Sequence, residues 1–187
     1  MKLFTAVFFI YLCIGNSLTN LHSDPVERFT YQEHSKLNWS DFKGVPPKNA
    51  IYFASVNSSL GYTFTSKTVD GKINVEIKVE CYFYPQLSWK RNLNENNPDL
   101  LDHEQLHWDI SELYARKLRA AFQKYVPQKD PKKEIDFIFR KFEKDRQQAQ
   151  KSYDRETRHG VIKETQKSWE SKIKEALFIT SEFAVDP

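Results

Sequence analysis

Apolar residues alternate with polar ones along residues 72–85, in the sequence KINVEIKVECYFYP. The apolar residues that share one face of this segment are Ile73, Val75, Ile77, Val79, Cys81 and Phe83. A period of two over this length predicts a β-strand with one buried face, in an antiparallel sheet. Asp70-Gly71 predicts a turn before this strand. Shorter strands are expected at 27–32, 50–56 and 60–66.

The tripeptide Asn-Pro-Asp at 97–99 begins the first of three predicted helices. Asparagine is a favoured N-cap, proline suits the first helical position, and an acidic side chain is stabilised at the positive end of a helix. We expect this helix to end near Tyr125, because Pro127 cannot continue it.

Two further helices are expected in the second half of the chain. Asp130-Pro131 begins one that extends to about Ser152, and a break at 153–160 separates it from the last helix, at 161–177. Strands followed by helices indicate an α+β fold, and the length of the chain favours a single domain over residues 18–187.

The N-terminus has the pattern of a secretory signal peptide. Lys2 precedes an uncharged apolar run at 3–14, and small residues follow it, so we predict a signal peptide over 1–17 and a secreted or periplasmic protein. The run is short for a membrane span, which leaves an uncleaved anchor as the alternative. Without this segment only Cys81 remains, which excludes an internal disulfide. The basic residues behind the net charge of +3 are dispersed, so nucleic acid is not an expected partner. No second apolar run of membrane length follows the signal peptide, so no membrane partner is expected after its cleavage.

Residues 103–107 read His-Glu-Gln-Leu-His and carry the candidate chemistry. At about 100° per helical residue, His103 and His107 share the apolar face and Glu104 lies at its edge. Two imidazoles one turn apart can chelate one zinc ion, and Glu104 could then act as the general base toward an activated water. A pair of core histidines is the alternative interpretation. The residues expected on the solvated face are Gln105, Asp109, Glu112 and Arg116.

A catalytic zinc ion needs a third protein ligand in addition to the two histidines. His159 is the histidine that follows the motif in the sequence, and we expect it to be that ligand. Asp154 and Glu156 are nearby alternatives, whereas Cys81 fits a small buried core thiol better than a ligand. Tyr153 is a candidate oxyanion donor, and it fits equally well as a core tyrosine.

Three segments resemble a bacterial family of predicted secreted zinc-dependent proteases, catalogued largely as a domain of unknown function. They are LNWSDFKGVPP at 37–47, HEQLHWDISELYARKLR at 103–119, and YDRETRHG at 153–160 with Gln166 and Trp169 after it. The resemblance covers about residues 30–175 and implies the same site: zinc ligands His103, His107 and His159, with Glu104 as general base.

The sequence therefore predicts a zincin-like α+β domain, with a twisted, mostly antiparallel sheet packed on the motif helix and C-terminal helices completing the site. The expected activity is that of a secreted zinc metallopeptidase, which holds a single Zn²⁺ and cleaves peptide or protein substrates. Two alternatives stay open: a non-catalytic zinc-binding protein of the cell envelope, and a zinc amidase or deacylase that acts on cell-wall peptides.

Overall fold

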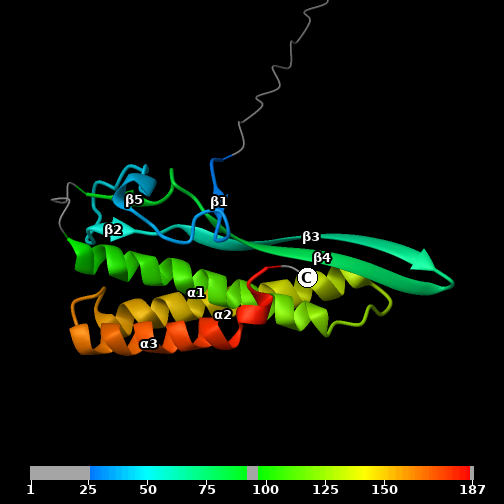
Figure 1. Cartoon of the computed structure of the whole chain (residues 1–187). Helices are drawn as coiled ribbons and strands as arrows, with labels where there is room; N and C mark the ends of the chain where they lie inside the picture. Colours follow the sequence, from blue (N-terminus) through cyan, green and yellow to red (C-terminus); the bar gives the residue numbers. More distant parts are fainter. Residues whose placement is uncertain (1–25, 92–96, 186–187) are drawn as a thin grey trace, which may run out of the picture.

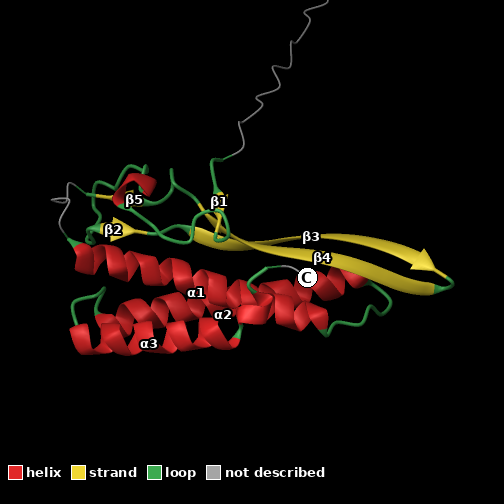
Figure 2. Ribbon diagram, viewed as in Figure 1, coloured by secondary structure: helices red, strands yellow, loops and turns green. Residues whose placement is uncertain are grey.

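Strands and helices occupy separate layers of the molecule (Figure 1). The computed structural model describes residues 26–91 and 97–185, so the predicted signal peptide at 1–17 lies outside the described residues. The strands are β1 (Phe29–Thr30), β2 (Ala54–Ser55), β3 (Ser58–Val69), β4 (Lys72–Phe83) and β5 (Trp89–Lys90). The helices are α1 (Pro98–Gln123), α2 (Pro131–Thr157) and α3 (Lys163–Ile179), with two short 3-10 helices, η1 (Trp39–Asp41) and η2 (Ser181–Phe183). The predicted α+β class is confirmed (Figure 2).

The strand layer is built around the β3–β4 hairpin. β1 pairs with the other edge of β4, and β2 and β5 form a separate two-stranded sheet; these pairs are antiparallel, as predicted. Asp70 (φ 50°) and Gly71 (φ 74°) form the predicted turn, in which both residues have positive φ, as a type I′ hairpin turn requires. The tip of the hairpin extends beyond the helices in Figure 1. The apolar face of β4 is therefore fully buried only in the second half of the strand, at Val79, Cys81 and Phe83.

Two of the shorter predicted strands are reduced to two residues each. β1 ends at Thr30 rather than at residue 32, because the chain turns there: the Glu33 carboxylate accepts a hydrogen bond from the Thr30 amide at 2.7 Å. β2 covers only Ala54–Ser55 of the predicted 50–56, since its partner β5 is equally short.

Helix α1 lies between the strand layer and the other two helices (Figure 1). The Asn97 side chain caps its start by accepting a hydrogen bond from the Leu100 amide at 3.2 Å, as the sequence predicts. Its apolar side chains pack in both directions. Trp108 contacts Phe83 of β4, with ring centroids 5.7 Å apart, and Ile110 packs toward α2 and α3.

The prediction of a solvated face on α1 is wrong at Glu112, whose side chain has 0% exposed surface. Its Oε1 accepts hydrogen bonds from Arg116 Nε at 2.9 Å, the expected pair one turn on, and from Arg119 Nη1 at 3.2 Å. Arg119 also donates to the Val79 carbonyl of β4. β4 and η2 therefore cover the part of the helix surface around Glu112 that amphipathic spacing assigned to solvent.

Helix α2 continues five residues past its predicted end at Ser152, so Tyr153 and Asp154 are helical. The helix persists because Tyr153 and Thr157 are buried, and the Thr157 hydroxyl donates to the Tyr153 carbonyl at 2.8 Å. The helical structure is interrupted only at 158–162, between α2 and α3. Among the helices within the described ranges, none combines the length and the apolar composition needed to cross a membrane.

Candidate metal centre

A cavity of about 620 Å³ opens between α1, α2 and the segment 51–58. His103, Glu104 and His107 reach it from successive turns of α1, and Asp154 reaches it from the last part of α2. The motif therefore lies at the floor of a space large enough for a small ligand or part of a peptide.

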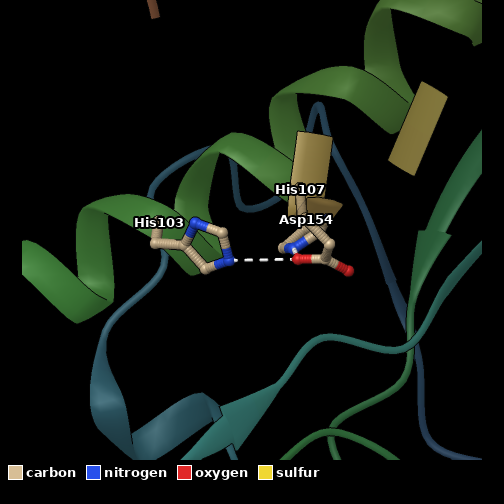
Figure 3. A group of neighbouring side chains, drawn as sticks. All are labelled: His103, His107 and Asp154. Atoms are coloured by element: carbon tan, nitrogen blue, oxygen red, sulfur yellow. Dashed lines mark hydrogen bonds and ion pairs between the residues drawn. The ribbon is translucent and has the colours of Figure 1, made fainter. Parts of the chain in front are cut away.

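Three donor side chains converge in this cavity (Figure 3). Asp154 Oδ1 lies 3.3 Å from His103 Nε2 and 3.0 Å from His107 Nε2. The three candidate ligand atoms all lie within 4.8 Å of one another. Asp154 was an alternative to His159 in the sequence, and the packing of α2 against α1 brings it opposite both histidines.

The far nitrogen of each motif histidine is bound to a glutamine side chain. His103 Nδ1 lies 3.2 Å from Gln166 Oε1, and His107 Nδ1 lies within hydrogen-bonding distance of Gln150 Oε1. The amide orientations follow from the other partners of these glutamines. Gln166 Nε2 donates to the Glu170 carboxylate at 2.9 Å, and Gln150 Nε2 donates to the His107 carbonyl at 2.8 Å.

An amide oxygen only accepts hydrogen bonds, so each Nδ1 carries a proton and each Nε2 faces Asp154. An Nε2 that also carries a proton donates it to the Asp154 carboxylate, whereas an Nε2 without a proton offers its lone pair to a metal ion. Three electron-rich atoms this close require a cation between them, either an extra proton or a metal ion. Burial alone would raise the pKa of Asp154, but hydrogen bonds from His103 and His107 hold that pKa well below its usual range. Two imidazole nitrogens and one carboxylate oxygen are ligands that suit zinc, so the donor set fits the predicted metal.

Glu104 lies beside this donor set and is not part of it. Its side chain lines the cavity, although the residue is only 3% exposed. Oε2 accepts a hydrogen bond from the Val56 amide at 3.0 Å, which ties the motif helix to the segment after β2. Burial raises the pKa of Glu104 above that of a solvated glutamate.

His159 contacts Asp154 and is not grouped with the motif histidines. Its Nδ1 lies 3.1 Å from Asp154 Oδ1, and its side chain is 36% exposed. Its ring contacts the ring of Tyr52 in a tilted arrangement, with centroids 3.9 Å apart. The turn that carries it has three successive left-handed residues: Arg158 (φ 48°), His159 (φ 55°) and Gly160 (φ 78°). A left-handed conformation costs a non-glycine residue on the order of 1 kcal/mol, so this turn concentrates strain beside the site.

Gly160 packs directly against the first motif histidine. A Cβ at this position would lie 3.2 Å from His103 Cβ and 3.2 Å from His103 Cγ. The positive φ and the close approach both favour glycine here.

Tyr153 is fully buried behind His103 instead of lining the cavity. Its ring stacks on the His103 ring at 4.6 Å, and its hydroxyl donates to Gln166 Oε1 at 2.7 Å. This placement makes Tyr153 a support for His103. Sequence reasoning gave no role to Gln166 or Gln150; the only available signal for Gln150 was its spacing of one helical turn before Asp154.

The other candidate ligands lie elsewhere. Cys81 is fully buried among core side chains of the strand layer, as expected for a core thiol. Glu156 accepts a hydrogen bond from Trp169 Nε1 at 3.0 Å on the exposed side of α2. Neither belongs to the group of converging donors.

A family model described as a bacterial protein of unknown function (DUF922) matches residues 37–160. The match includes His103, Glu104, His107, Asp154 and His159, whereas Gln166 lies beyond it. No curated protein and no solved structure matches the chain.

Proposed function

The chain belongs to the DUF922 family of bacterial proteins, and we propose that it is a zinc-dependent peptidase. The observation that carries this proposal is the convergence of His103 Nε2, His107 Nε2 and Asp154 Oδ1 at the floor of a cavity. Both Nδ1 atoms are already occupied, which leaves the Nε2 lone pairs for a metal ion. The predicted signal peptide would place this activity outside the cytoplasm.

We assign the third ligand to Asp154, with His159 as its hydrogen-bond partner. Ligating carboxylates are commonly held by a hydrogen bond from a neighbouring side chain, which fixes their orientation. His159 Nδ1, 3.1 Å from Asp154 Oδ1, would take this part. The ring contact with Tyr52 then restrains the imidazole from the opposite side of the cavity.

Glu104 is the proposed proton carrier. A bound zinc ion would polarise the scissile carbonyl and activate a water molecule. Glu104 would accept the proton from that water and donate it to the leaving amine. Its Oε2 is held by the Val56 amide, so Oε1 is left for the proton. The raised pKa that burial gives Glu104 suits a group that must both accept and release a proton near neutral pH.

The edge of β2 supports a peptide as substrate. Ala54 pairs with Lys90 and Ser55 with Trp89, while the Arg91 amide donates to the Phe53 carbonyl at 2.8 Å. In an antiparallel pair, backbone groups alternate in direction, so the amide and carbonyl of Ala54 point away from β5. Ala54 lines the cavity, and an extended peptide could add to this edge as a further strand.

The deciding experiment compares the wild-type protein with Glu104→Gln after both have been loaded with zinc. We expect both to bind close to one zinc ion per chain, and hydrolysis of fluorescently labelled casein to fall at least about a hundredfold in the variant. A glutamine can still accept the Val56 hydrogen bond, so the fold should be unchanged. Equal activity of the two proteins, or a wild-type protein that takes up no zinc, would contradict the proposal.

The non-catalytic alternative gives a different result in the same experiment. If zinc binds tightly and neither casein nor amide substrates are cleaved, the ion has a structural role and His159 becomes the candidate fourth ligand. If only small acyl-amide substrates are cleaved, the site is that of an amidase or deacylase.

A further inference from the structure

The two walls of the cavity differ in charge. The wall formed by residues 51–58 contains no charged side chain, whereas α2 and the turn after it contribute Arg146, Lys151 and Arg158. The acidic side chains in the lining are Glu104 and Asp154. Both carboxylates already have partners within the protein: Glu104 accepts a hydrogen bond from the Val56 amide, and Asp154 faces the two motif imidazoles.

Arg146 is part of the structure of this wall and not available to a ligand. It is 6% exposed and forms a bidentate pair with the Glu143 carboxylate, at 2.8 Å from Nε and 2.7 Å from Nη2. Its Nη1 donates to Ser111 Oγ at 3.1 Å. All three nitrogens of the guanidinium group are therefore satisfied within the protein.

Lys151 and Arg158 are different, since both are exposed and neither forms an ion pair within residues 26–91 and 97–185. They lie three residues before and four residues after Asp154, which places one cation about one helical turn to each side of the donor set. Arg158 is also the left-handed residue that ends α2, so the strained turn contributes to its position at the cavity.

We infer that the substrate is an acidic peptide, with carboxylates on both sides of the scissile bond that bind Lys151 and Arg158. This inference rests on the proposed peptidase function and specifies its substrate class. Ile51 and Phe53, 78% and 60% exposed, provide apolar contacts on the opposite wall, at residues 51–58. An extended peptide presents alternate side chains in opposite directions, so acidic and apolar residues in alternation would meet both walls.

The binding test uses the Glu104→Gln protein in the presence of added zinc and two fluorescein-labelled octapeptides. One carries glutamates on both sides of a central leucine–alanine pair, and the other carries glutamines at those positions. Fluorescence anisotropy at low salt should show roughly fivefold to tenfold tighter binding of the glutamate peptide, the effect of two exposed charge pairs. The added substitutions Lys151→Gln and Arg158→Gln should remove this preference.

The matched control is Lys144→Gln with Arg155→Gln, which removes the same charge from exposed positions of α2 outside the cavity lining. It should retain the preference for glutamate. Equal affinity for the two peptides, no measurable binding of either, or an equal loss in the control would overturn the inference.

Zinc content and casein hydrolysis are measured for the wild-type protein in parallel. If the protein binds zinc and cleaves casein but shows no charge preference, the proposed function is supported and this inference is wrong. If the protein prefers the glutamate peptide through Lys151 and Arg158 but neither binds zinc nor cleaves casein, the charge preference is supported and the proposed function is wrong.

Discussion

Asp154 Oδ1 lies 3.0 Å from His107 Nε2, although 47 positions separate the two residues in the chain. The contact depends on the packing of α2 along α1 and on the five residues by which α2 exceeds its predicted end. Without that extension Asp154 would lie in a loop, where its carboxylate would not be held opposite the motif. The length of α2 therefore defines the candidate metal centre.

The first prediction separates Asp154 from His159 as zinc ligands. Asp154→Asn should weaken zinc binding by more than about a hundredfold, because it removes a charged ligand. His159→Ala should weaken it by only about tenfold, the usual effect of losing a group that orients a ligand. Competition with a chromophoric chelator gives both affinities. Glu156→Gln, on the exposed side of the same helix, is the control and should bind zinc like the wild type.

The reverse order of these two effects would identify His159 as the ligand. Asp154 would then be the residue that orients it through the 3.1 Å contact with Nδ1.

The second prediction concerns the glutamine that holds His103. Gln166→Leu removes the acceptor for His103 Nδ1 and for the Tyr153 hydroxyl, so the imidazole can adopt the other tautomer. We expect zinc affinity to fall about tenfold to a hundredfold. Gln148→Leu, at an exposed position of α2, should have no effect on affinity. Unchanged binding by the Gln166 variant would show that this hydrogen bond does not determine the tautomer.

The third prediction tests Tyr153 as an oxyanion donor against its position behind His103. Tyr153→Phe keeps the ring that stacks on His103 and removes the hydroxyl that binds Gln166. At saturating zinc we expect kcat on a peptide substrate to change less than about threefold, since the hydroxyl is not in the cavity lining. A fall in kcat of about a hundredfold with unchanged KM would instead support the oxyanion role, because that loss is typical of a missing oxyanion donor.

The sequence was sufficient to predict elements that depend on local signals. Asn97 and Pro98 defined the start of α1, and Asp70-Gly71 defined the hairpin turn. The environment of Glu112 was not predictable in this way, because amphipathic spacing assumes one solvated face and α1 is covered on both sides. The convergence of Asp154 with the motif required the relative placement of two helices, which no local pattern contains.

The fourth prediction follows from the buried carboxylate of Glu112. Its Oε1 binds Arg116 and Arg119, and its Oε2 has no hydrogen-bond partner among the described residues. Glu112→Ala removes the buried carboxylate that both guanidinium groups bind, and we expect a loss of about 3 kcal/mol in the free energy of unfolding. Urea denaturation measures this loss. Glu164→Ala, in the exposed first turn of α3, should change the free energy of unfolding by less than about 0.5 kcal/mol.

The last prediction uses two glycines that share a backbone conformation and differ in their surroundings. Gly160 has φ 78° and Gly71 has φ 74°, so replacement by alanine imposes similar strain at both, on the order of 1 kcal/mol. An added Cβ at Gly71 meets nothing within 4 Å, whereas at Gly160 it lies 3.2 Å from His103 Cβ.

Both alanine variants should therefore lose stability when unfolding is measured on zinc-free protein, and Gly160→Ala should lose more, because its new methyl group meets the buried His103. Only Gly160→Ala should also lose zinc affinity, by about tenfold or more, because the new methyl group displaces the His103 imidazole from its position opposite Asp154. If the two variants bind zinc equally well, the approach of Gly160 does not position His103. If only Gly160→Ala loses zinc affinity, the close approach of the backbone at Gly160 to His103 is needed for the metal centre. The left-handed turn at 158–160 makes this approach possible.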